Sequence, residues 1–109
     1  MLKVISLMRR ADGMSKREFT TWITEEHVKF ARAIPGLDGF VVNVTPEDLD
    51  LPWDSVNELY FANEAARDAA FASPEGQASG ADAAAHTSER VHLPTAQHML
   101  ISPRTVEPR

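Results

Sequence analysis

The 109-residue sequence contains no cysteine, which excludes disulfide bonds, thiolate chemistry and cysteine-ligated zinc. No apolar run approaches the ~20 residues that a membrane span requires. The apolar start, residues 1–10, is too short for a signal peptide and has no small-residue cleavage site. Absent cysteine also fits a reducing compartment. We therefore expect one cytoplasmic domain with no membrane segment.

Basic residues are in the minority, with 11 lysines and arginines against 16 acidic residues and a net charge of -5. This balance, without any basic run, argues against a nucleic-acid partner because phosphates would be repelled. The sequence also lacks a glycine-rich phosphate loop and a Gly-x-Ser-x-Gly motif, so nucleotide binding and serine hydrolysis have no support. Its four histidines form no His-x-x-x-His or His-x-His pair, so no metal site is predicted.

What the sequence does contain is a pattern of strands and amphipathic helices. The apolar run at residues 2–9 is typical of a buried strand. Ser15 and Glu18 form a capping box, which predicts a helix over residues 16–33. At 100° per residue this helix has one apolar face, with Glu26 inside it and His27 on its border. That face is formed by Phe19, Trp22, Ile23, Phe30, Ala33 and Ile34.

The rest of the chain completes a βαββαβ order. Strands are predicted at 40–44 and 55–61 around an acidic loop, then a helix at 64–72 that restarts at Pro74, and a last strand at 92–101. This order is the split arrangement of ferredoxin-like α+β folds, in which one face of the sheet has no helices. Because Val, Leu, Tyr and Met side chains would lie on that bare face, we expect a homodimer that packs sheet to sheet.

Several short segments together resemble the EthD family of the dimeric α+β barrel superfamily, over nearly the whole chain. The resemblance implies domain boundaries of 1–102, with a C-terminal tail at 103–109. The segments that carry it are Gly13-Met14-Ser15, His27, Ile34-Pro35-Gly36-Leu37, Phe40, Val56, Glu58-Leu59-Tyr60-Phe61, Phe71-Ala72-Ser73-Pro74-Glu75-Gly76-Gln77 and His98.

The resemblance implies a dimer with a cavity between sheet and helices, and a protein that uses no cofactor. One related group resembles the methylmuconolactone isomerases, which shift a proton on a lactone with a histidine matching His27. Those isomerases carry a tyrosine where this chain has Phe40, a side chain with no proton to donate. Fungal relatives are assigned decarboxylation or dehydration of aromatic polyketides. The family therefore implies a class of ligand, a small organic acid, lactone or aromatic compound, without fixing the reaction.

His27 is the first candidate for a catalytic residue, because histidine is the side chain best suited to moving protons near neutral pH. Its alternative is a structural histidine bonded to a backbone carbonyl. Glu58 shares the bare side of its strand with Val56 and Tyr60 and is the second acid/base candidate, or else an interface glutamate. Glu26 is expected to be structural, and His86 and His92 to be solvated surface residues. The expected substrate-binding residues are Phe40, Trp53, Tyr60 and His98.

Three functions remain open from the sequence. The first is a cofactor-independent enzyme in which a histidine transfers a proton during isomerisation, dehydration or decarboxylation of a lactone or aromatic acid. The second is a non-catalytic protein that binds or carries a pathway intermediate. The third is a cofactor-free monooxygenase acting on an easily oxidised phenol or anthrone, as other dimeric α+β barrels do.

Overall fold

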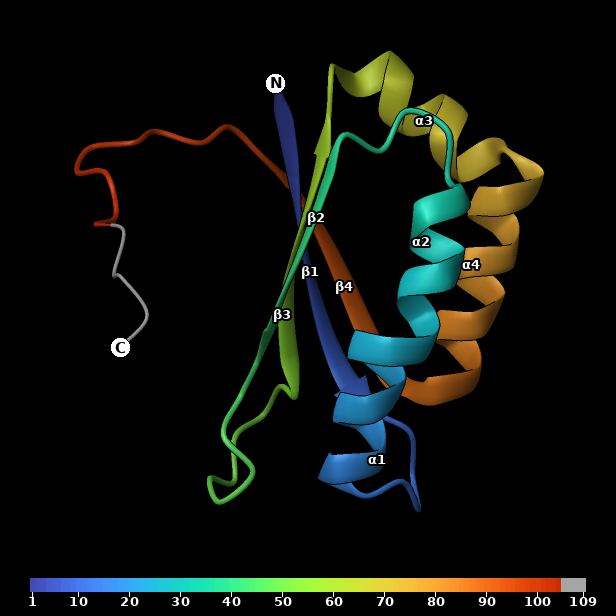
Figure 1. Cartoon of the computed structure of the whole chain (residues 1–109), viewed down its shortest axis with the longest axis vertical. Helices are drawn as coiled ribbons and strands as arrows, with labels where there is room; N and C mark the ends of the chain where they lie inside the picture. Colours follow the sequence, from blue (N-terminus) through green and yellow to red (C-terminus); the bar gives the residue numbers. More distant parts are fainter. Residues whose placement is uncertain (105–109) are drawn as a thin grey trace.

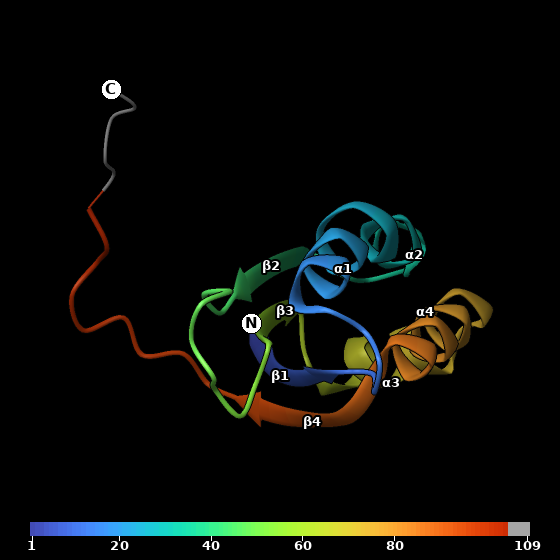
Figure 2. The ribbon, with the colours of Figure 1, turned by 90° about the horizontal axis from the view of Figure 1, so that it is seen from below.

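The computed structural model describes residues 1–104, and the structure is one antiparallel sheet with helices on one side. Its strands are β1 (Leu2–Arg10), β2 (Gly39–Val44), β3 (Ser55–Phe61) and β4 (Thr87–Thr95), in the order β2-β3-β1-β4. Figures 1 and 2 show all helices on the same face of this sheet. The predicted ferredoxin-like α+β fold is confirmed. The expected tail at 103–109 lies largely outside the described residues.

The pairing register assigns each strand residue to one of the two faces. Val4, Ser6 and Met8 of β1 pair with Leu59, Asn57 and Ser55 of β3, and all six are buried beneath the helices. Lys3, Ile5 and Leu7 pair with Tyr60, Glu58 and Val56. This second set alternates with the first and lies on the open face, as the sequence predicts for Glu58 and Tyr60.

The first helical segment contains a π-turn that the sequence pattern does not predict. It begins with α1 (Lys16–Thr21), continues as a π-helical turn (Trp22–Glu26), and ends with α2 (His27–Ala33). The His27 amide donates to the Trp22 carbonyl five residues earlier. The wider turn moves every later buried position along by one residue. The expected face was therefore wrong at Phe30 and Ala33, whereas Ile34 is buried as expected.

The residues affected by this shift change places with their neighbours. His27 is buried and Glu26 is exposed. Ala31 and Ile34 are buried, whereas Phe30 and Ala33 are exposed. The helix then stops at Pro35-Gly36, where Gly36 takes a φ of +79° that other residues rarely adopt. Sequence periodicity alone assumes 3.6 residues per turn and so misplaces the histidine.

The second helical segment consists of α3 (Glu64–Ala72) and α4 (Pro74–His86), joined at Ser73. The Ser73 hydroxyl accepts from the Gly76 amide, and Pro74 occupies the first turn. A Cβ at Gly76 would lie 2.0 Å from the Ala70 carbonyl oxygen. Only glycine therefore permits the close approach of these two helices.

The last strand begins earlier than the sequence pattern indicates. β4 starts at Thr87, directly after α4, and ends at Thr95, so the predicted last strand exists but its bounds of 92–101 were wrong. Pro94 lies inside β4, which is an edge strand and so tolerates a missing amide donor. Residues 96–104 leave the sheet on the side opposite the helices (Figures 1 and 2). No helix among residues 1–104 is both long enough and apolar enough to cross a bilayer.

The core between sheet and helices forms two apolar clusters. One contains Val4, Ile34, Leu59, Phe61 and Ala70, and the other contains Met8, Phe19, Trp22, Ile23 and Ala83. The aromatic members are almost fully buried, and burial of such a side chain contributes roughly 1.5–3 kcal/mol. The space where the two clusters meet is the location of the cavity described below.

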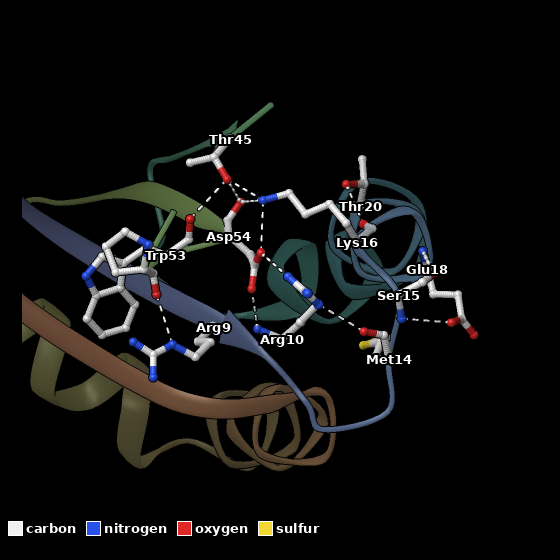
Figure 3. A network of polar contacts seen from close by, with 11 residues as sticks. Arg9, Arg10, Met14, Ser15, Lys16, Glu18, Thr20, Thr45, Trp53 and Asp54 are labelled. Carbon is white, nitrogen blue, oxygen red and sulfur yellow. Dashed lines mark hydrogen bonds and ion pairs between the residues drawn. The ribbon is translucent and has the colours of Figure 1, made fainter. Parts of the chain in front are cut away.

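A buried carboxylate fastens the loop between β2 and β3 to the first helix (Figure 3). Asp54 accepts from the Arg10 amide at 2.8 Å, from Arg10 Nη1 at 2.7 Å and from Lys16 Nζ at 2.9 Å. Burial alone would raise the pKa of Asp54, but the bonds from Arg10 and Lys16 lower it overall. Lys16 Nζ also contacts the Thr45 hydroxyl. This network joins the end of β1 and the residue before β3 to the start of α1.

Candidate active site

His27 follows the π-turn directly and is only 5% exposed. Its Nδ1 lies 2.8 Å from Oδ2 of Asp82, a residue of α4. A carboxylate can only accept, so Nδ1 carries the proton in this bond and Nε2 of the neutral ring is left as the acceptor. Within residues 1–104 no hydrogen bond reaches Nε2. The arrangement is that of an oriented general base.

Asp82 is itself held in place by two aromatic neighbours. The Trp22 indole N–H donates to Asp82 Oδ2 at 3.1 Å. His86 stacks on the Trp22 ring with a centroid separation of 4.6 Å, and its Nδ1–H donates to the Asp82 backbone carbonyl at 2.7 Å. The expectation that His86 is a solvated surface residue was therefore wrong. These contacts fix the carboxylate and, through it, the His27 ring.

The His27 ring borders a cavity of about 80 Å³ between the sheet and the helices. Met8 and Ala83 of one core cluster and Ile34 and Leu59 of the other contribute its walls. Phe40 of β2 also lines it, with its ring centroid 6.4 Å from that of His27. The volume is well below the roughly 300 Å³ at which drug-sized ligand sites begin. It suits a small ring or the reacting end of a larger molecule.

The cavity has a polar floor and a basic rim. Ser6 and Asn57 form the floor, and they are 1% and 0% exposed. Arg90 and His92 of β4 form the rim. His92 lies on an exposed edge strand, yet its ring packs on Phe71 at 5.7 Å, and this desolvation, with the charge of Arg90, lowers the pKa of His92. His92 is an exposed residue, as expected, although one side of its ring packs on Phe71.

The structure brings together only two of the predicted site residues, His27 and Phe40. Glu58 and Tyr60 lie on the opposite face of the sheet, where Lys3 Nζ is 2.6 Å from Glu58 Oε1 and the Tyr60 hydroxyl donates to the same oxygen at 3.1 Å. The bond from Lys3 is the main cause that lowers the pKa of Glu58. These two residues do not share a cavity with the histidine.

The remaining predicted residues are also distant from the cavity lining. Trp53 belongs to the loop between β2 and β3, and the Arg9 guanidinium lies 5.3 Å from its ring centroid. His98 is exposed beyond the end of β4 and is not part of the sheet. Neither residue is among those that line the His27 cavity.

Sequence reasoning missed Asp82, Asn57 and Ser6. Asp82 is the one acidic residue between Glu75 and Glu89, in an alanine-rich helix. A lone carboxylate there was the available signal, because a buried histidine needs a partner. Ser6 and Asn57 break the apolar alternation of their strands, which was the signal for a polar floor. Within the described part of the chain, no group of three or more histidine and acidic side chains is arranged to hold a metal ion.

Comparison with solved structures shows the same fold in other small proteins. An EthD family protein from Bacillus halodurans is 24% identical, with a TM-score of 0.76, over 90% of this chain and 99% of that chain. A dimeric ferredoxin-like protein of unknown function from Thermobifida fusca is 20% identical, with a TM-score of 0.71, over 88% of this chain and 90% of that one. An antibiotic biosynthesis monooxygenase is 19% identical, with a TM-score of 0.65, over 90% and 99% of the two chains.

A search of curated protein sequences finds no match. The model of the EthD domain, however, matches residues 11–90, a span that includes His27, Asp82 and most of the cavity lining. This match covers well over half of the chain. On this evidence the chain belongs to the EthD family, as its sequence motifs indicate.

Proposed function

We propose that this protein is a small enzyme that transfers a proton on a lactone, small organic acid or aromatic compound, with His27 as the proton-transfer group and no cofactor. One observation carries the proposal, which is the 2.8 Å contact between His27 Nδ1 and Asp82 beside a mostly apolar cavity. Isomerisation, dehydration and decarboxylation all fit such a group. A residue positioned in this way contributes about 10²–10⁴-fold to a rate.

The contacts around His27 support the role of base better than a structural role. A structural histidine normally satisfies both ring nitrogens, whereas here Asp82 engages Nδ1 and the ring borders the cavity. In the proposed step, Nε2 removes a proton from a carbon of the ligand and Asp82 stabilises the resulting imidazolium. Phe40 and Leu59 help exclude water from this space, which strengthens the interaction between the two charged groups.

The test measures deuterium exchange at the acidic C–H of a panel of lactones and aromatic acids, by proton NMR in D₂O. His27→Gln should slow exchange by about 10²-fold or more. His98→Gln is the matched control, because His98 is exposed and does not line the cavity. Equal rates in wild type and His27→Gln would contradict the proposal.

The same panel separates the two alternatives. A carrier protein would bind a compound, seen as a rise in melting temperature, without any exchange for His27→Gln to remove. A monooxygenase would consume oxygen when given a phenol or anthrone, and an oxygen electrode measures this directly. The likeness to an antibiotic biosynthesis monooxygenase supports that reading only at the level of fold.

We also propose that two copies pack through the open face of the sheet. Structural neighbours are described as dimeric ferredoxin-like proteins. On the open face, Val41 and Leu93 are 42% and 46% exposed, unusually large values for apolar strand residues. Residues 96–104 extend on that side, where Leu100 and Ile101 are each 89% exposed (Figure 1). A second copy there would cover both the sheet face and this segment.

Sedimentation tests the dimer. Leu93→Lys introduces a charge into the proposed interface and should convert the dimer to monomer, because a buried unpaired charge is costly. Phe30→Lys is the control, since Phe30 is a 38% exposed apolar residue on the helical side. A wild type that sediments as a monomer would exclude the sheet-to-sheet dimer.

A further inference from the structure

The floor of the cavity carries two polar side chains that face each other across neighbouring strands. Ser6 of β1 and Asn57 of β3 are register partners and are almost completely buried. Within residues 1–104 the Ser6 hydroxyl and both amide atoms of Asn57 have no hydrogen-bond partner. Both residues line the cavity that His27 borders. Three polar atoms therefore face a space enclosed mainly by apolar walls.

Such an arrangement is unfavourable for the folded protein alone. A buried donor or acceptor without a partner forfeits the hydrogen bonds that it makes to water in the unfolded chain. Of the neighbouring inward positions on the same strands, Val4, Met8 and Leu59 are apolar, and only Ser55, which does not line the cavity, is polar. An apolar pair would fit this pattern and leave nothing unpaired. The polar pair is therefore better explained by a bound molecule than by folding.

We propose that Asn57 and Ser6 bind the carbonyl end of the ligand, and that this ligand is a small, uncharged, conjugated carbonyl compound. This inference rests on the proposed function and names its substrate class. The Asn57 amide N–H donates to the carbonyl oxygen, and the Ser6 hydroxyl donates to the same oxygen or to its ring neighbour. Among the residues that line the cavity, Arg90 alone carries a permanent charge, and it lies at the rim. The floor accordingly selects a neutral group.

The pair also has a role in the reaction. When His27 removes the proton from the carbon, the C–H bond breaks and its electron pair moves through the conjugated system onto the carbonyl oxygen, giving an enolate. The imidazolium then returns the proton to another carbon, so no oxidant or co-reactant is consumed. A hydrogen bond from Asn57 is stronger to the enolate oxygen than to the neutral carbonyl. It therefore lowers the barrier as well as binding the ligand.

The test compares two ring compounds that differ only in the carbonyl. Butenolide is the simple five-membered unsaturated lactone, and dihydrofuran is the same ring without the carbonyl oxygen. Dissociation constants come from NMR titration of wild type, Asn57→Leu, Ser6→Ala and His27→Gln. Ser55→Ala is the matched control, because the Ser55 hydroxyl is also buried and unpaired but does not line this cavity.

We expect Asn57→Leu to weaken butenolide binding by about tenfold or more, with little effect on dihydrofuran. Ser6→Ala should weaken it less, and Ser55→Ala should leave it unchanged. The free Asn57→Leu protein should melt at the same temperature as wild type or about 4 °C higher, because the unpaired amide is gone. A gain in stability with a loss of binding is the signature of a ligand site, which a purely structural asparagine would not give.

Two results would overturn the inference. One is an Asn57→Leu protein that melts lower and binds butenolide as wild type does, which would mean that the pair serves folding, through bound water. The other is no binding of butenolide to wild type up to its solubility limit. His27→Gln separates this inference from the proposed function. If Asn57→Leu loses binding while His27→Gln keeps full exchange, the carbonyl site stands and His27 is not the base.

Discussion

Two aspartates, a buried one directly before β3 and a partly buried one on α4, show how the same side chain serves structure in one place and chemistry in another. Asp54 is 3% exposed at its side chain and is surrounded by donors that carry permanent charge, Lys16 and Arg10 (Figure 3). Asp82 is 15% exposed and contacts the neutral indole of Trp22 and the ring of His27. One carboxylate is saturated by cations, and the other is paired with a group that gains and loses a proton.

The difference decides what each site is able to do. At Asp54 both cations, Arg10 and Lys16, are already paired with the carboxylate, so no charge of the network is left without a counter-charge. At Asp82 the hydrogen bonds end on His27, whose ring borders a cavity. A saturated ion-pair network favours rigidity. A series of hydrogen bonds that ends on a ring nitrogen without a partner, here Nε2 of His27, favours proton transfer.

The largest effect is expected from Asp54→Ala, which should lower the free energy of unfolding by about 3–5 kcal/mol. The reason is that Lys16, at 9% exposure, would be left buried without its counter-charge. Urea unfolding followed by circular dichroism measures this. Asp50→Ala, on the exposed part of the same loop, is the control and should change stability by less than about 0.5 kcal/mol.

The double variant Asp54→Leu with Lys16→Met identifies the origin of that loss. If the cost comes from the unpaired Lys16 charge, removal of both charges should recover most of the stability, since apolar replacements of buried ion pairs are often neutral. A double variant as unstable as Asp54→Ala would instead assign the loss to the Arg10 amide and to packing.

Asp82→Asn should have the reverse profile, a large loss of rate with a small loss of stability. We expect proton exchange to slow by about 10²-fold, because an amide no longer stabilises the imidazolium or fixes the tautomer of His27. Stability should fall by only about 1 kcal/mol, since the amide oxygen still accepts from Trp22. Asp68→Asn, at a 70% exposed side chain, controls for the change in charge. If Asp82→Asn instead lowered the stability strongly and left the exchange rate unchanged, Asp82 would be a structural residue like Asp54.

The fold could be predicted because strong local signals agree with it. The capping box of Ser15 and Glu18 and the Ser73-Pro74 helix start appear in the structure as expected. The last strand was misplaced because β4 runs along a sheet edge with mostly exposed residues, so it lacks apolar alternation. The apolar run Met99-Leu100-Ile101 imitated a strand but is exposed. A hydrophobic pattern predicts a strand correctly only where its apolar residues are buried. Most of β4 is exposed, and so is the apolar run at 99–101.

The site could be predicted only in part. Histidine chemistry drew attention to His27, but its burial depends on a π-turn that no periodic pattern contains. Asp82 lies 55 residues away in the sequence and meets His27 only through the packing of α2 on α4. Glu58 was the second acid/base candidate, and its place on the open face of β3, which the alternation predicts, keeps it out of the His27 cavity. Contacts between side chains of different helices or strands depend on tertiary packing, which sequence patterns do not reveal.

Acid should distinguish the Asp54 network from the rest of the protein. Because the folded-state pKa of Asp54 is lowered below its ordinary 3.8, its contribution to stability is complete above pH 3.8 and disappears as pH falls through the lower folded-state value. The stability difference between wild type and Asp54→Asn should therefore be constant from pH 7 to about 5 and shrink below about 4. Urea titrations across this range measure it. A difference that persists unchanged at pH 2 would exclude an ionic origin.

The smallest effect is expected from Arg10→Met, which removes the exposed cation of the Asp54 network and leaves the buried one. The Arg10 side chain is 42% exposed, so water and salt screen its 2.7 Å contact with Asp54. We expect a loss of at most about 1 kcal/mol, which diminishes in high salt. Lys16→Met removes the same charge from a buried position and should cost several times more. Equal losses would mean that Asp54 needs both cations, and that the burial of Lys16 is not what distinguishes this aspartate from Asp82.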